Sequence, residues 1–102
     1  MENEIFTSKD IHEISCRYSD FNDCLNAVAD KLKAITGINM YFCEILGARW
    51  SFCAGDIKLD IPQHKIKISD NYGIMTGEIC ISENQWVKIL NVLRNFIEQK
   101  AL

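Results

Sequence analysis

The amino-acid sequence predicts an α+β domain: an antiparallel sheet of about five strands with N-terminal and C-terminal helices packed on one face. Two observations predict it. Segments 20–36 and 82–100 carry apolar residues at helical spacing, and the region between them consists of short apolar or alternating runs separated by turn residues. Helices at both ends of a run of strands are typical of one sheet covered by helices. A length of 102 residues fits a single domain over residues 1–102.

Two helices are expected before the first strand. Residues 9–18 predict a short helix capped by Ser8, with Ile11 and Ile14 on one side. A longer helix over residues 20–36 begins at a cap formed by Ser19 or Asp20 and ends at Gly37. Its predicted apolar face consists of Phe21, Cys24, Leu25, Val28, Leu32 and Ile35.

Five strands are expected, over residues 38–46, 49–54, 57–61, 65–69 and 73–82. The first is rich in aromatic and branched residues and has few polar ones, which predicts burial on both faces. The second alternates, which places Trp50, Phe52 and Ala54 on one buried face. Gly77 in the last strand indicates a bulge or a close approach of backbone.

The closing helix is predicted from the capping-box spacing of Ser82 and Gln85 and runs to about residue 100. Its apolar stripe is broader than one sheet covers, so a second partner is expected on it. We predict a homodimer paired through the terminal helices. The alternative is that helix 9–18 packs over helix 82–100 within one chain. The predicted interface residues are Ile11, Ile14, Trp86, Leu90, Leu93 and Ile97.

The segment DFNDCLNAVADKLKAITGINMYFCEILGARWSFCAGD (20–56) resembles the opening of a GAF domain. In that family an amphipathic helix ends in a Thr-Gly step, here Thr36–Gly37, and runs into a central strand. A hairpin follows that often ends in Ala-Gly, here Ala54–Gly55. NYGIMTGEICIS (71–82) resembles the penultimate strand of the family. The resemblance implies a sheet of this kind and pairing through terminal helices.

This chain also departs from the GAF pattern. Only residues 59–70 separate the hairpin region from the last strands, which is too short for the helix-and-loop insert that covers a GAF ligand. Nucleotide or tetrapyrrole binding is therefore not carried over, and the cofactor stays unknown. PAS domains and the profilin-like roadblock and longin modules have a similar sheet and remain alternatives.

Charge and hydropathy exclude two classes of partner. The net charge is −3 and the eleven Lys and Arg residues are scattered, whereas nucleic-acid binding needs a dense basic stripe. No apolar run approaches the roughly 20 residues that span a bilayer. The first residues, MENEIF, lack the pattern of a secretory signal. We therefore expect a cytoplasmic protein that binds neither nucleic acid nor membrane.

Five cysteines are present, without a C-x-x-C pair. Cys24, Cys43 and Cys80 lie within apolar patterns and are interpreted as buried thiols. His12 and Cys16 share a helical face at the i, i+4 spacing and form at most half a metal site, so they are interpreted as solvated and no metal site is predicted.

Catalysis is not expected. A thiol enzyme of the free methionine sulfoxide reductase type would use Cys43, Cys53 or Cys80, but no histidine lies near them in the chain to activate a thiol. The carboxylate pairs Asp20 with Asp23 and Asp56 with Asp60 fall at helix caps and turns, where solvated or capping roles explain them.

The function predicted from the sequence is a non-catalytic sensory or regulatory domain that binds a small ligand or a protein partner. Aromatic residues with a few polar neighbours build such sites. The candidate ligand-binding residues are Tyr41, Trp50, Phe52 and Tyr72, whose alternative role is in the core. A structural interaction subunit without a pocket and a thiol-dependent enzyme remain the alternative functions.

Overall fold

The computed structural model describes residues 6–55 and 62–100. This part of the chain contains three helices and four strands. The helices are α1 (Ser8–Arg17), α2 (Phe21–Thr36) and α3 (Glu83–Lys100), and the strands are β1 (Met40–Leu46), β2 (Arg49–Gly55), β3 (His64–Lys67) and β4 (Tyr72–Thr76).

The four strands form one antiparallel sheet in the order β2-β1-β4-β3. β1 is an interior strand: Phe42 pairs with Ala54 of β2 on one side and with Ile74 of β4 on the other. β3 forms the second edge and pairs with β4. Phe42 on one face and Cys43 on the other are buried, but Tyr41 is only half-buried, so the prediction that the first strand is buried on both faces is only partly right.

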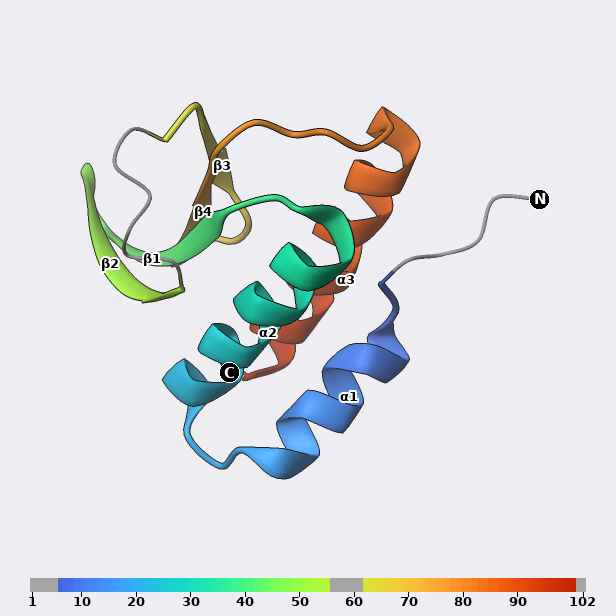
Figure 1. Cartoon of the computed structure of the whole chain (residues 1–102). Helices are drawn as coiled ribbons and strands as arrows, with labels where there is room; N and C mark the ends of the chain where they lie inside the picture. Colours follow the sequence, from blue (N-terminus) through green and yellow to red (C-terminus); the bar gives the residue numbers. More distant parts are fainter. Residues whose placement is uncertain (1–5, 56–61, 101–102) are drawn as a thin grey trace.

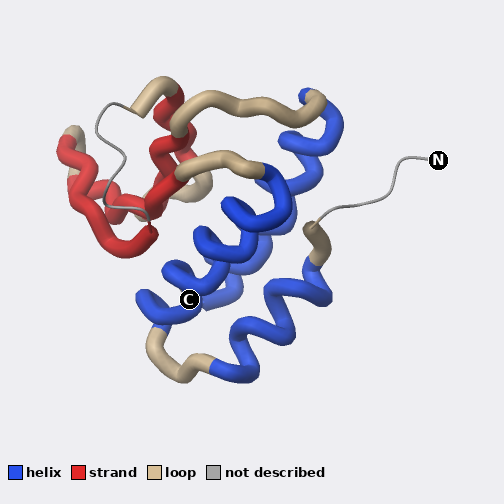
Figure 2. The backbone as a smooth tube through the Cα atoms, in the orientation of Figure 1, coloured by secondary structure: helices blue, strands red, loops and turns tan. Residues whose placement is uncertain are grey.

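The helices lie in two layers on one side of the sheet (Figures 1 and 2). α2 packs against β1 and β2, and α3 shares the buried core with α2 and the sheet and contacts the β3–β4 turn through Arg94. α1 packs over α2 and α3 on the side away from the strands. The prediction that both terminal helices cover the sheet is thus only partly right. α3 covers the sheet, whereas α1 packs over α2 and α3. The alternative prediction, that helix 9–18 packs over helix 82–100 within one chain, therefore describes α1 better.

Helix ends follow from local hydrogen bonds. The carboxylate of Asp20 accepts the backbone N–H of Asn22 at 2.8 Å, which confirms Asp20 as the cap of α2. α2 ends at Gly37, which adopts φ 75°. The expected cap of α1 was wrong by one residue. Thr7, not Ser8, is the N-cap, and its N–H donates to the Asp10 carboxylate at 2.9 Å.

Side chains tie α2 to the sheet at both of its ends. The Thr36 hydroxyl donates to the carbonyl of Leu32 at 2.6 Å and accepts the N–H of Ile38 at 3.1 Å. This fixes the turn from α2 into β1. Near the other end, the side-chain oxygen of Asn26 accepts the N–H of Gly55 at 2.7 Å and holds the end of β2.

The core lies between the sheet and the two long helices. The sheet, α2 and α3 each contribute side chains that are at most 1% exposed. Burial of these apolar stripes therefore holds α2 and α3 to the sheet. These residues are Leu25, Val28 and Leu32 of α2, Ile89, Leu93 and Ile97 of α3, and Phe42 and Ile74 of the sheet.

Three expectations about elements and burial need correction. The last strand ends at Thr76 instead of residue 82. The next residue, Gly77, donates its N–H to the carbonyl of Asn39 just before β1. Ile35 and Cys80 are exposed, although their patterns suggested burial. Ile35 lies at the edge of the α2 stripe, and Cys80 lies in the connection to α3. The strand expected over 57–61 falls outside the described residues.

Candidate functional site on the open face of the sheet

The face of the sheet opposite the helices is the candidate site. Phe42 and Ile74 pair and point into the core, so strand residues one position away point outward. All three helices lie on the other side (Figure 1). None of the outward-facing residues in the four described strands is Asp or Glu. They are Tyr41, Cys43 and Ile45 of β1, Trp50 and Phe52 of β2, Lys65 and Lys67 of β3, and Gly73 and Met75 of β4.

Trp50 reaches across this face. Its ring lies against Gly73 of β4, where a Cβ would overlap the six-membered part of the indole. β2 and β4 are not neighbours in the sheet, so the indole crosses β1 to reach Gly73. The ammonium group of Lys65, from the far edge strand, lies 4.5 Å from the centre of the Trp50 ring. This is a cation–π contact that joins opposite edges of the sheet.

Tyr41 and Phe52 extend the aromatic surface beside Trp50. Their ring centres are 5.6 Å apart at an interplanar angle of 50°. The Tyr41 hydroxyl makes a contact of 3.0 Å with the sulfur of Met75. Phe52 is 45% exposed, while Tyr41 and Trp50 are half-buried. We call Tyr41, Trp50, Phe52 and Lys65 the aromatic face.

A β-bulge creates this arrangement. Phe42 pairs with Ala54 and Cys43 with Phe52, so Cys53 is the extra residue in β2. The bulge shifts the alternation: Ala54 faces the core, while Trp50 and Phe52 face outward. The prediction that these three residues share one buried face was therefore wrong.

Tyr72 does not join the other three candidate ligand-binding residues. It pairs with Glu44 on the helix-facing side of β4, and its ring contacts Phe21 of α2 edge-to-face at 5.6 Å. Burial raises the pKa of Tyr72, and the nearby Glu44 carboxylate and Cys53 add to the shift. The structure brings together Tyr41, Trp50 and Phe52 and places Tyr72 across the sheet from them.

Cys43 lies on the outward side of β1 and is only 1% exposed. Burial raises the pKa of its thiol, Cys53 raises it further, and Lys65 partly opposes the shift. Burial also raises the pKa of Cys53, with the carboxylate of Glu44 adding to the effect. Both shifts favour the protonated thiol, which is the less nucleophilic form. The local chemistry of these two cysteines therefore resembles that of structural thiols.

Most of the residues predicted for a dimer interface lie in the interior of this chain. Ile11, Trp86, Leu93 and Ile97 are at most 8% exposed and belong to the core. Ile14 and Leu90 are half-buried and pack against it. The broad apolar stripe of α3 is thus covered from two sides, by the sheet and by α1. In this conformation the four buried side chains offer no surface to a partner.

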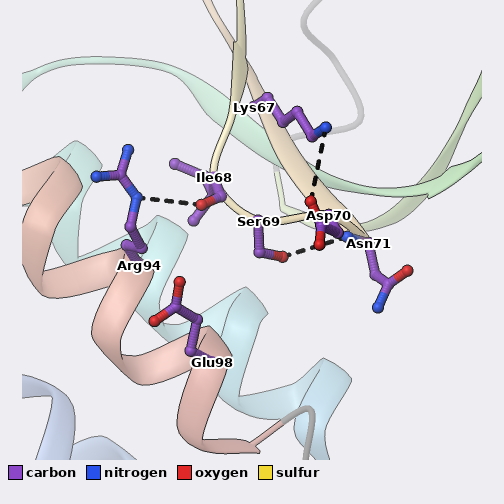
Figure 3. A pocket seen from close by; sticks show the side chains of 7 residues that line it. All are labelled: Lys67, Ile68, Ser69, Asp70, Asn71, Arg94 and Glu98. Carbon is purple, nitrogen blue, oxygen red and sulfur yellow. Dashed lines mark hydrogen bonds and ion pairs between the residues drawn. The ribbon is translucent and has the colours of Figure 1, made fainter.

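A depression of about 660 Å³ lies between the β3–β4 turn and α3 (Figure 3). Arg94 of α3 donates from Nε to the carbonyl of Ile68 at 3.2 Å, and Lys67 pairs with Asp70 at 3.8 Å. The Ser69 hydroxyl accepts the N–H of Tyr72 at 3.2 Å. These contacts close the turn and attach it to α3, and charges of both signs line the depression. We therefore assign it a structural role.

His12 and Cys16 lie next to each other on the exposed side of α1, as their spacing predicted. Among residues 6–55 and 62–100, no three His, Cys, Asp or Glu side chains are grouped closely enough to hold a metal ion. None of the helices in this part of the chain has the length and apolar content needed to cross a membrane.

Sequence reasoning missed Lys65 and Gly73 as parts of the site. The segment 65–69 was predicted only as a strand, and nothing in it pointed to a contact between Lys65 and a ring on another strand. A signal for Gly73 did exist, because a glycine within a strand often marks a close approach by another group. We applied that argument to Gly77, which lies beyond the end of β4.

Comparison with models of protein families, with curated proteins and with solved structures finds no match for this chain. The resemblance to GAF domains therefore stays a prediction, and the geometry of the aromatic face carries the functional argument.

Proposed function

We propose that this protein is a non-catalytic recognition module of the sensory or regulatory kind, which binds through the aromatic face of its sheet. The observation that carries the proposal is the exposure of Phe52 beside Trp50 and Tyr41 on a face that the helices leave open. Aromatic side chains that together form a partly exposed apolar patch on a small domain are characteristic of binding surfaces.

The chemistry of the aromatic face favours a ligand with a flat apolar part and a negative charge. Trp50 and Phe52 supply apolar area, and Lys65 supplies a cation beside it. Within strands β1 to β4 as the structure describes them, the outward-facing positions include Lys65 and Lys67 but no carboxylate, although the whole chain has a net charge of −3. An aromatic anion is therefore the best match, as a free small molecule or as part of a larger partner.

A calorimetric titration with 1-naphthoate tests this proposal, with 1-naphthalenemethanol as the uncharged probe of similar shape. We expect the wild-type protein to bind the anion measurably and the alcohol at least several-fold more weakly. Phe52→Ser should reduce the affinity for both probes. Lys65→Gln should weaken only the anion, because it removes charge and leaves the rings in place.

Two variants on α3 serve as matched controls. Val87 is 48% exposed and Lys88 is also exposed, and both lie away from the aromatic face. Val87→Ser and Lys88→Gln should leave the affinity for naphthoate unchanged. Failure of the wild-type protein to bind either probe, or equal weakening by the α3 variants, would overturn the proposal.

A further inference from the structure

A second feature lies on α1, on the side of the molecule away from the sheet. His12 and Cys16 are one helical turn apart, and the Cys16 sulfur lies 3.7 Å from Nε2 of His12. Both side chains are exposed. They line a groove of about 770 Å³ between α1 and α3 together with polar side chains such as Asn95 and Gln99.

The separation of these two atoms suits a tetrahedral metal ion. Zinc binds a thiolate at about 2.3 Å and an imidazole nitrogen at about 2.0–2.1 Å, so the two ligand atoms stand about 3.6 Å apart at the tetrahedral angle. The sulfur and the nitrogen already lie close to that distance. An ion held by both would require little movement of either side chain.

We propose that His12 and Cys16 form half of a zinc site that the same pair from a second copy of this chain completes. One ion would be held by two imidazole nitrogens and two thiolates. On binding, each Cys16 thiol releases its proton to solvent, each imidazole binds as the neutral ring, and the ion gives up bound water for four protein ligands. No electron is transferred.

Two observations favour a second copy as the source of the other ligands. No third His, Cys, Asp or Glu joins the pair within the described residues, whereas structural zinc sites use four ligands. In addition, α1 buries Ile11 against its own chain, whereas His12 and Cys16 are exposed at the edge of the groove, where a second chain can reach them. A two-fold axis through the ion would give both chains the same role.

The proposed zinc site shares no residue with the aromatic face, so a test that overturns one of the two proposals leaves the other unaffected. Titration with Co²⁺ tests it, because tetrahedral cobalt with thiolate ligands gives intense visible bands and a charge-transfer band in the near ultraviolet. We expect both bands to saturate at one ion per two chains. Light scattering of the Zn²⁺-loaded protein should show a doubled mass that returns to the starting value after chelation.

Cys16→Ser and His12→Ala should each abolish the cobalt bands and the doubling. Both residues are exposed, so circular dichroism should show unchanged helix content. Cys80→Ser and His64→Ala remove exposed residues of the same types elsewhere and should preserve both signals. A weak octahedral spectrum, saturation at one ion per chain without doubling, or retention of the bands in Cys16→Ser would each overturn the proposal.

Discussion

The indole of Trp50 occupies the space that a side chain at position 73 would need. This contact connects β2 to β4 across the intervening strand and positions the ring for Lys65 to lie against it. The shape of the aromatic face therefore depends on a residue that contributes no side chain.

Gly73→Ala should destabilise the domain by about 1–3 kcal/mol, the usual cost of overpacking. The added methyl group would overlap the ring of Trp50 and approach the carbonyl of Ile66. Chemical denaturation measures the free energy of unfolding. In a Trp50→Ala background, the same substitution should cost clearly less, because the ring is gone. An equal cost in both backgrounds would show that Trp50 does not lie against Gly73.

Asn26→Ala should lower the free energy of unfolding by about 0.5–1.5 kcal/mol, the net value of a typical hydrogen bond. The substitution removes the acceptor for the N–H of Gly55 and loosens the end of β2 from α2. Asn22→Ala is the control, because the cap of α2 uses the backbone of Asn22. Hydrogen exchange at Gly55 should accelerate only in the Asn26 variant. If both variants behave alike, the bond contributes nothing specific.

The five cysteines should react with a thiol reagent in an order set by exposure. Cys16 and Cys80 are exposed, Cys53 is intermediate, and Cys24 and Cys43 are buried. In the native protein we expect two thiols to react quickly, a third slowly, and the last two only after unfolding. Mass spectrometry of the labelled peptides identifies the sites. Rapid native labelling of Cys43 would contradict its position beneath the aromatic surface.

Stability should fall in alkaline solution. Burial raises the pKa of Cys43 and Cys53 above an ordinary thiol value of 9.0, so the unfolded chain loses these protons at lower pH than the folded one. The contribution of the two protonated thiols to the free energy of unfolding is fully present below pH 9.0. It is lost as the pH rises toward the folded-state pKa values of Cys43 and Cys53. Raised pKa values of Tyr41 and Tyr72 act in the same direction above pH 10.

Denaturation of Cys43→Ala between pH 7 and 10.5 provides the comparison. This variant should begin less stable at pH 7, because it loses a buried side chain, but its stability should decline less steeply than that of the wild-type protein. Parallel curves would mean that the Cys43 thiol does not contribute to the alkaline loss.

The sequence predicted the helical elements well because their signals are local. Asp20, Gly37 and the apolar spacing of α2 act within one or two turns, so the helix was placed almost to the residue. The apolar composition of β1 agrees with its position between β2 and β4. The order of the strands depends on contacts between distant residues, such as Phe42 with Ile74, and it was not predicted.

The candidate site was predicted only in part, and the reason lies in Cys53. Because Cys53 is an extra residue in the strand, the side chains before it and after it alternate out of step and point to opposite faces of the sheet. The alternating pattern RWSFCA gives no sign of this extra residue. The sequence therefore grouped Trp50 and Phe52 with Ala54, whereas in the structure they lie on opposite sides of the sheet. Tyr72 was misplaced for the same kind of reason, because its side depends on register with Glu44.

We propose that the aromatic face, and not the helical layer, is the binding surface. Mapping of the backbone amide shifts by NMR during titration with 1-naphthoate tests it most directly. We predict that the largest shifts fall on Tyr41, Trp50, Phe52 and Lys65 and that Phe52→Ser removes them. Shifts concentrated on α1 and α3, or their persistence in Phe52→Ser, would contradict the claim.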